Sequence, residues 1–247
     1  MHKSKLVEND NRNISDFFMC GAKSLNIDLP YNALTLFEKY FDFLDKKSKI
    51  INLTSITGTE NVAQLHFLDS ISLLNIEVFK NKRIIDIGSG AGFPGVPIKI
   101  AEPSIDLTLL DAIGKRVNFL LDLSTILNLD FKCIHARAEE VAHDMDFREK
   151  YDIAVSRAVG HLNIICEICL PFVCIGGMFI AMKGINSADE IAEASNAIKV
   201  LGAQLEKSHN YTIPGTDISH NAVIIRKMHE APNNYPRRNA KIQRTPL

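Results

Sequence analysis

The chain has 247 residues, of which 46% are hydrophobic, which is enough for one full-sized core and a small additional lobe. The formal net charge of −1 excludes an overall basic character, so any role in nucleic-acid binding must rest on local charge. Five cysteines, an odd number, and the lack of a secretory signal pattern predict reduced thiols and a cytoplasmic protein.

The first 75 or so residues carry a helical pattern. After Pro30, apolar residues recur at helical spacing: Leu34, Phe37, Phe41 and Leu44. A second apolar stripe follows in ENVAQLHFLDSISLL, residues 60–74. These stripes predict an N-terminal helical lobe over residues 1–75 that docks on the domain behind it. His66 and Asp69 lie three residues apart in the second stripe, and we predict a solvated or capping arrangement for them rather than an acid–base pair.

Residues 84–95 read IIDIGSGAGFPG and join an isoleucine-rich run to a glycine-rich turn. The run predicts a buried parallel strand that ends at Asp86, with this carboxylate facing a ligand rather than the following helix. Gly88, Gly90 and Gly92 have no Cβ to obstruct close approach of the backbone to that ligand. The segment therefore predicts a small-molecule site at the mouth of an α/β sheet.

Two cofactor classes compete for this loop. Residues 90–95 satisfy G-x-G-x-x-G, and Asp111 lies at about the right distance downstream to hold a ribose, which is the dinucleotide pattern. A carboxylate at position 86 would repel a pyrophosphate at the helix N-terminus, whereas the amine and sulfonium of S-adenosylmethionine are cationic. The residues therefore favour S-adenosylmethionine, and a nicotinamide or flavin dinucleotide is the alternative.

Strands and helices are predicted to alternate from Arg83 onward. Strands are expected near 83–87, 106–110, 131–135, 151–156 and 177–182, with helices near 94–102, 114–127, 161–174 and 187–201 between them. Two further strands, 203–211 and 221–228, follow each other without a helix, which predicts an antiparallel hairpin at one edge. The predicted fold class is α/β: a doubly wound, mostly parallel, seven-stranded Rossmann-like sheet in a domain over residues 76–230.

The apolar segment 162–182 raises two questions, a membrane span and a metal site. Glu167, Pro171 and the Gly176-Gly177 pair interrupt the run, so it is predicted to divide into helix, turn and strand rather than to cross a membrane. Cys166 and Cys169 form a C-x-x-C, but no second pair or histidine cluster completes a zinc site. Core thiols and no metal are therefore expected.

Polar residues at the strand ends are the candidate ligand contacts. Asp111 ends the second strand, where its carboxylate can accept both ribose hydroxyls, and its alternative role is to cap the next helix. Ala138 and Glu139 follow the third strand where an adenine edge would lie, although Glu139 could equally serve as a first-turn helix residue.

The end of the fourth strand, Val155-Ser156-Arg157-Ala158, faces the methyl acceptor in this fold. It contains neither the Asn-Pro-Pro-aromatic run that serves exocyclic amines nor a cysteine nucleophile. An arginine suits an electron-rich ring nitrogen, and guanine N7 and O6 form the edge that arginine reads. Arg157, together with Lys183 at the end of the fifth strand, is therefore a candidate on the substrate side, with a surface ion pair as the alternative for Arg157.

The last segment, residues 231–247, is a basic tail. It carries Arg237, Arg238, Lys241 and Arg244 and has no acidic residue after Glu230. Such a segment can pair with phosphates, and a solvated disordered end is the alternative.

Several motifs occur together in an order and spacing that resemble one family. They are NLTSI (52–56), HFLDS (66–70), DIGSGAGFPGVPIKI (86–100), LLDAIGKRVNFL (109–120), RAEE (137–140), SRA (156–158), MKG (182–184) and YPR (235–237). The chain from about residue 30 onward thereby resembles the ribosomal RNA small subunit methyltransferase G family, also called glucose-inhibited division protein B.

This resemblance implies S-adenosylmethionine as the cofactor and methyl transfer to N7 of a guanosine in 16S ribosomal RNA or the small ribosomal subunit. It also implies cofactor contacts for Gly88, Phe93, Ala138, Glu139 and Arg157, which puts Arg157 nearer the cofactor than the substrate argument does. A monomer without membrane contact is expected. An NAD(P)-dependent oxidoreductase and a non-catalytic RNA-binding module are the alternative functions.

Overall fold

The computed structural model describes residues 13–247, and residues 1–12 of the predicted N-terminal lobe lie outside the described residues. Within the described part, one sheet of seven strands has the order β3-β2-β1-β4-β5-β7-β6. The strands are β1 (Arg83–Ile87), β2 (Asp106–Asp111), β3 (Lys132–His135), β4 (Tyr151–Arg157), β5 (Val173–Gly184), β6 (Ala203–Thr212) and β7 (Ser219–Lys227). Neighbouring strands are parallel except that β7 runs antiparallel to both β5 and β6. The predicted fold class, with its C-terminal hairpin, is confirmed.

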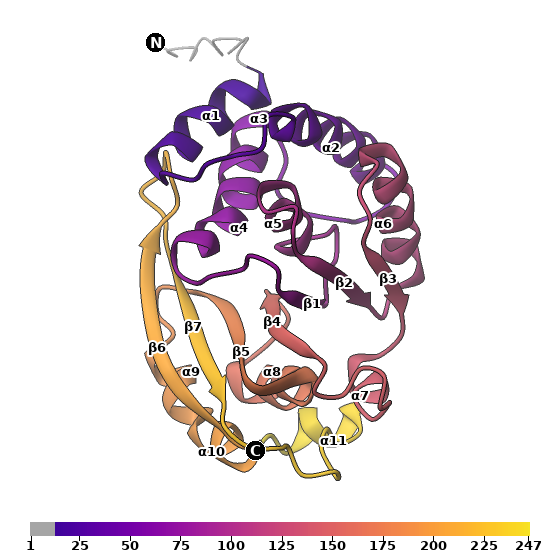
Figure 1. Cartoon of the computed structure of the whole chain (residues 1–247), viewed down its shortest axis with the longest axis vertical. Coiled ribbons are helices and arrows are strands. Elements are labelled where there is room, and N and C mark those ends of the chain that lie inside the picture. Colours follow the sequence, from indigo (N-terminus) through magenta and orange to yellow (C-terminus); the bar gives the residue numbers. More distant parts are fainter. Residues whose placement is uncertain (1–12) are drawn as a thin grey trace, which may run out of the picture.

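The α-helices of residues 13–247 lie on both faces of this sheet (Figure 1). They are α1 (Ile14–Ser24), α2 (Ala33–Ser48), α3 (Thr59–Val62), α4 (Asp69–Ile71), α5 (Gly95–Ala101), α6 (Gly114–Leu127), α7 (Ala138–Val141), α8 (Leu162–Cys169), α9 (Ala188–Glu193), α10 (Ser195–Val200) and α11 (Asn239–Arg244). A π-helical segment, Ala63–Leu68, joins α3 to α4, and short 3-10 segments, Ser72–Asn75 and Leu170–Phe172, follow α4 and α8. The N-terminal helices, α5 and α6 cover one face, and α8 to α11 cover the other.

The strands feed two separate cores because successive side chains point to opposite faces of the sheet. In β1, Ile84 belongs to the core under the N-terminal helices, whereas Ile85 and Ile87 belong to the core under α8 and α10. Leu109 and Leu110 of β2 divide in the same way. A parallel strand buried on both faces reads as a continuous apolar run, which is why the sequence located these strands.

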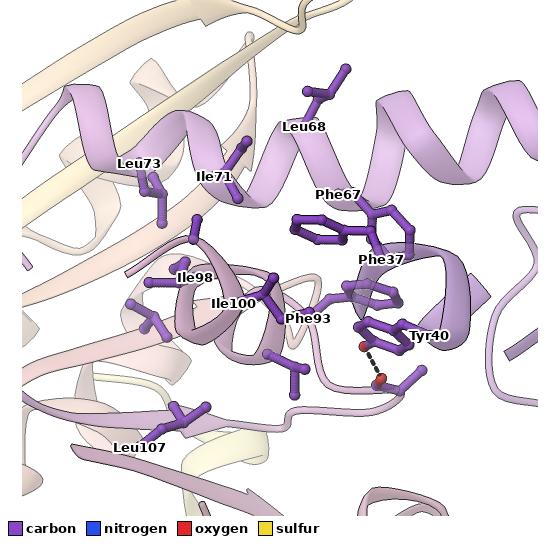
Figure 2. Packing of buried hydrophobic residues seen from close by; sticks show 14 of the residues in the cluster. Phe37, Tyr40, Phe67, Leu68, Ile71, Leu73, Phe93, Ile98, Ile100 and Leu107 are labelled. Carbon is purple, nitrogen blue, oxygen red and sulfur yellow. Dashed lines mark hydrogen bonds between the residues drawn. The ribbon is translucent and has the colours of Figure 1, made fainter. Parts of the chain in front are cut away.

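The N-terminal helices share their core with the sheet domain. Figure 2 shows Phe37 and Tyr40 of α2 beside Phe67 and Phe93, the last of which lies in the loop after β1. The rings of Tyr40 and Phe93 stack with their centroids 5.4 Å apart, and the Tyr40 hydroxyl donates to the backbone oxygen of Ala91. Helix α1, for which the sequence showed no motif, packs so closely here that a Cβ on Gly21 would lie 2.2 Å from Leu68.

Strand β5 begins earlier than predicted. The Gly176-Gly177 pair does not lead into the strand; it lies inside it, at an irregularity in the register between β4 and β5. Gly176 has φ of +81°, and a Cβ on Gly177 would lie 2.6 Å from the backbone oxygen of Asp152. The pair therefore permits a bulge at which two backbones approach closely. The helix predicted over 187–201 is two helices, α9 and α10, which meet at Ala194.

The C-terminal segment folds onto the domain, which rules out the alternative of a solvated, disordered end. Ile242 of α11 is fully buried in the core beneath α8. Arg237 donates to the buried Glu167 carboxylate from Nε at 2.8 Å and from a terminal nitrogen at 2.6 Å. Across residues 13–247 no helix is long and apolar enough to span a membrane.

Candidate active site

A cavity of about 900 Å³ lies at the carboxyl ends of the parallel strands. One part of its wall is the glycine loop after β1 together with residues 111–113, at the end of β2. The other part combines the ends of β4 and β5 with residues 53–56, the His66–Asp69 region and His220 of β7. This is the edge at which open α/β sheets bind ligands, and the volume suits a nucleoside-sized molecule.

The glycine loop forms as predicted, with φ of +74° at Gly88 and +58° at Gly90. Both residues line the cavity, and the nearest atom to the position that a Cβ on Gly90 would occupy is the backbone oxygen of Gly88, 3.9 Å away. Gly92 does not line the cavity; its Cβ position is filled by the Tyr40 hydroxyl, 2.7 Å away. Two glycines therefore open the backbone toward a ligand, and the third makes room for α2.

Asp86 faces the helix after the loop and not the cavity, so its predicted orientation is wrong. The side chain is fully buried, and its Oδ2 accepts the first backbone N–H of α5, from Gly95, at 2.8 Å. Among the described residues its Oδ1 has no hydrogen-bond partner. Burial raises the pKa of this carboxyl to about 7.

Asp111 lines the cavity and bonds to the backbone of the two loops that surround it. Its Oδ2 accepts from Gly90 N–H at 2.9 Å and its Oδ1 from Ile113 N–H at 2.8 Å. It lies before Ile113, the N-cap residue of α6, so it is not the helix cap. A carboxylate has about four acceptor positions, so both oxygens retain capacity for ribose hydroxyls. Ile113, 47% exposed on the cavity wall, offers an apolar surface beside it.

Ala138 and Glu139 do not line this cavity. Ala138 is buried at the start of α7, and Glu139 borders a second cavity of about 580 Å³ next to His143 and the C-terminal segment. Glu139 lies 3.8 Å from Arg137. Of the predicted site residues, those that line the cavity are Gly88, Gly90, Phe93, Asp111, Arg157 and Lys183.

Arg157 is held by a buried network, and here the prediction of solvated His66 and Asp69 side chains is wrong. Asp69 is fully buried, and its Oδ2 accepts from the Arg157 guanidinium at 2.9 Å. Its Oδ1 accepts from the hydroxyl of Tyr211 at 2.8 Å and from Nδ1 of His220 at 2.9 Å. Arg157 also lies 2.7 Å from Nδ1 of His66.

The network fixes the charges of its members. Burial raises the pKa of Asp69, but the hydrogen bond from His220 and the charge of Arg157 outweigh it, so the pKa lies below its ordinary value. Burial and the Arg157 charge lower the pKa of His66 to about 3, which keeps this imidazole neutral. The His66 ring stacks on the Phe93 ring with the two centroids 4.2 Å apart. The Arg157 guanidinium carbon lies 5.0 Å from the centroid of the Phe93 ring.

Sequence reasoning missed Tyr211 and His220 as members of the network. They come from the C-terminal hairpin, and only the fold brings them to α4. The available signal was Asp69 itself, because an acidic residue between Leu68 and Ile71 is buried if that segment is buried on all sides, and a buried carboxylate needs partners.

Lys183 lines the cavity but its charge is paired. Its Nζ lies 2.6 Å from Glu190 of α9 and donates to the backbone oxygen of Gly160 at 2.7 Å. The remaining candidate cluster, Cys166 and Cys169, is buried in the core on α8, and burial raises the pKa of the Cys169 thiol well above its ordinary value. They are core thiols, as predicted.

The donor set fits S-adenosylmethionine better than a dinucleotide. The first N–H of the helix after the glycine loop is already bonded to the buried Asp86 carboxylate, so it is not offered to a pyrophosphate. The open backbone at Gly90 and the Asp111 carboxylate suit an adenosine with free ribose hydroxyls. The class of protein follows from the order of the strands, the antiparallel strand β7 and this glycine loop. It is an S-adenosylmethionine-dependent methyltransferase.

Comparison with known proteins supports this assignment to the methyltransferases. The fold is shared with TrmN from Thermus thermophilus, with a TM-score of 0.50 and 15% identity over 64% of this chain and 48% of that chain. The family model described as GidB, rRNA small subunit methyltransferase G, matches residues 33–217.

Curated relatives cover nearly the whole chain. The ribosomal RNA small subunit methyltransferase G of Acetivibrio thermocellus is 42% identical over 92% of this chain and 94% of its own. The ribosomal RNA small subunit methyltransferase G of Alkaliphilus oremlandii is also 42% identical, over 95% of this chain and 99% of its own. The chain therefore belongs to the rRNA small subunit methyltransferase G family, which confirms the resemblance, and it is an S-adenosylmethionine-dependent rRNA methyltransferase.

Proposed function

We propose that this protein transfers a methyl group to N7 of a guanosine in 16S ribosomal RNA, with the glycine loop and Asp111 holding the cofactor and the Arg157 end of the cavity receiving the base. The observation that carries the proposal is that one cavity joins these two groups of residues. When bound, S-adenosylmethionine supplies the methyl group from its sulfonium.

The acceptor end of the cavity suits an atom that needs no deprotonation. Two carboxylates line it, Asp69 and Glu190, and each is ion-paired, with Arg157 and Lys183 respectively. His66 is neutral and accepts from Arg157. Guanine N7 carries an available lone pair, so the work of these residues is to orient the base, and a fixed orientation lowers the barrier by up to several kcal/mol.

His220 allows a sharp test of this point. Its Nδ1 is bound to Asp69, so among the described residues that line the cavity Nε2 of this ring is the nitrogen to test as a base. Methyl transfer to N7 requires no base, so His220→Gln should lower the single-turnover rate less than tenfold. A loss of a hundredfold or more, the size of a general-base contribution, would instead indicate an acceptor that must be deprotonated.

The competing functions are separated by binding and turnover. Titration with S-adenosylmethionine and with NADH should give binding of the first only, and NADH binding would favour the oxidoreductase. A protein that binds S-adenosylmethionine and RNA but transfers no methyl group would be an RNA-binding module.

We further propose that the protein acts as a monomer in the cytoplasm, on 16S ribosomal RNA or on the small subunit assembled around it. Arg238, Lys241 and Arg244 are exposed on the C-terminal segment and suit phosphate contacts. Arg237 is committed to Glu167 instead. Light scattering would test the monomer, and methylation of naked RNA and of subunits in parallel would decide between the two substrates.

A further inference from the structure

A chain of hydrogen bonds runs from the Arg157 network to Thr54 in the NLTSI motif. Arg157 lies 2.7 Å from Nδ1 of His66, and Nε2 of the same ring lies 2.8 Å from the Thr54 hydroxyl oxygen. The backbone N–H of Ile56 donates to that oxygen at 3.0 Å. Thr54 and His66 both line the cavity, beside Arg157.

Arg157 sets the direction of the two hydrogen bonds that His66 makes in this chain. A guanidinium can only donate, so Nδ1 of His66 must accept from it. His66 is neutral, with a pKa of about 3, so its single ring proton is on Nε2. That N–H donates to the Thr54 oxygen. The reverse orientation, in which Thr54 donates to Nε2, would place a proton on Nδ1 against the arginine.

Thr54 is thereby left with a proton to give and no lone pair to offer. Its oxygen already accepts twice, from His66 and from Ile56, which uses both of its acceptor positions. Within residues 13–247 no protein acceptor receives its hydroxyl proton. The side chain is an obligate donor on the wall of the cavity that also contains Arg157.

We propose that the Thr54 hydroxyl donates to O6 of the guanine whose N7 is methylated, and so determines the choice of base. This inference rests on the proposed function, which puts that base at the Arg157 end of the cavity. Guanine presents N7 and O6 as neighbouring acceptors on one edge, whereas adenine presents N7 beside an N6 amino donor. Because Thr54 cannot accept, an amino group at this position meets a donor, and the mismatch disfavours adenine.

The test compares two bases that share N7 and the 2-amino group and differ at position 6 and in the proton on N1, which only guanine carries. Small subunits are reconstituted with 16S ribosomal RNA carrying either guanosine or 2,6-diaminopurine riboside at the methylated position; the second keeps N7 and replaces O6 with an amino group. The value of kcat/KM for each is measured with the wild type, Thr54→Val, Thr54→Ala and Thr54→Ser. Thr57→Val is the matched control, because Thr57 is exposed and does not line the cavity.

We expect Thr54→Val and Thr54→Ala to lower kcat/KM for guanosine about 3- to 10-fold, with no matching loss for 2,6-diaminopurine. The preference for guanosine should then fall by that factor, while Thr54→Ser and Thr57→Val keep the wild-type preference. The affinity for S-adenosylmethionine should be unchanged in all variants.

An unchanged preference in Thr54→Val and Thr54→Ala would overturn the inference. General damage to the loop would lower kcat/KM for both substrates by the same factor and leave the preference unchanged. If the wild type itself transfers no methyl group to guanosine N7, the proposed function fails first, and the two failures are thereby distinguished.

Discussion

Asp86 gives the most quantitative prediction, because it is a fully buried carboxyl with one hydrogen bond. Burial raises its pKa from 3.8 to about 7, against the opposing effect of the Gly95 N–H. One pKa unit corresponds to about 1.4 kcal/mol, so holding this carboxylate ionised in the folded protein costs about 4 kcal/mol relative to the unfolded chain. Asp86→Asn removes this cost and keeps an oxygen that can accept from Gly95.

The sign follows from proton binding. Between about pH 4 and pH 7 the folded state holds the Asp86 proton and the unfolded state does not, so the folded state binds more protons. The contribution of Asp86 to stability is therefore present at low pH and lost as the pH rises toward 7. Relative to the wild type, Asp86→Asn should gain about 4 kcal/mol in free energy of unfolding between pH 4 and pH 8.

The assay is urea unfolding of both proteins at several pH values in this range, analysed by linear extrapolation. The difference between the two proteins cancels the opposite contribution of His66, whose pKa of about 3 makes stability fall as the pH falls. Asp217→Asn, at an exposed aspartate, is the control and should differ from the wild type by a constant amount. Stability curves for Asp86→Asn and the wild type that stay parallel across the range would refute the reasoning.

The remaining predictions concern the cofactor loop and the basic segment. Gly88→Val should weaken S-adenosylmethionine binding by at least about fivefold, because φ is +74° and a Cβ would lie 2.7 Å from a neighbouring side chain. If calorimetry gives an unchanged affinity for a folded variant, Gly88 is not part of the site. Asp111→Ala should weaken it by about 1.5 to 3 kcal/mol, and a lower melting temperature with an unaltered dissociation constant would assign Asp111 to loop structure alone. Replacing Arg238, Lys241 and Arg244 by alanine should flatten the log–log salt dependence of RNA affinity by up to about 3 while cofactor affinity stays constant; equal slopes would reject the RNA contact.

The sheet and the glycine loop were predictable because their signals are local. The β-branched run and the closely spaced glycines lie within a dozen residues of each other. The alternation of predicted strands and helices then indicates the fold of the whole domain. The direction in which Asp86 points was not predictable in this way. It depends on the start of α5, whose first N–H captures the carboxylate, and the same residue pattern allows either orientation.

The acceptor end could not be predicted because it is assembled over long sequence separations. Asp69 meets Arg157 across 88 residues, Tyr211 across 142 and His220 across 151. Spacing along a helix suggested a solvated face for Asp69, and tertiary burial overrode it. The C-terminal tail also could not be predicted in full. The sequence suggested that Arg237 is available to phosphate, whereas in the fold it pairs with Glu167.

The most direct test of the account is the product of one turnover. Purified protein, radiolabelled S-adenosylmethionine and small subunits from cells that lack this modification are mixed with enzyme in excess. The methylated nucleotide is then identified by the strand scission that N7-methylguanosine undergoes after borohydride and aniline. We expect one methyl group per subunit, at N7 of a single guanosine. Label at an exocyclic amine, at a ribose or at no RNA position would contradict the account.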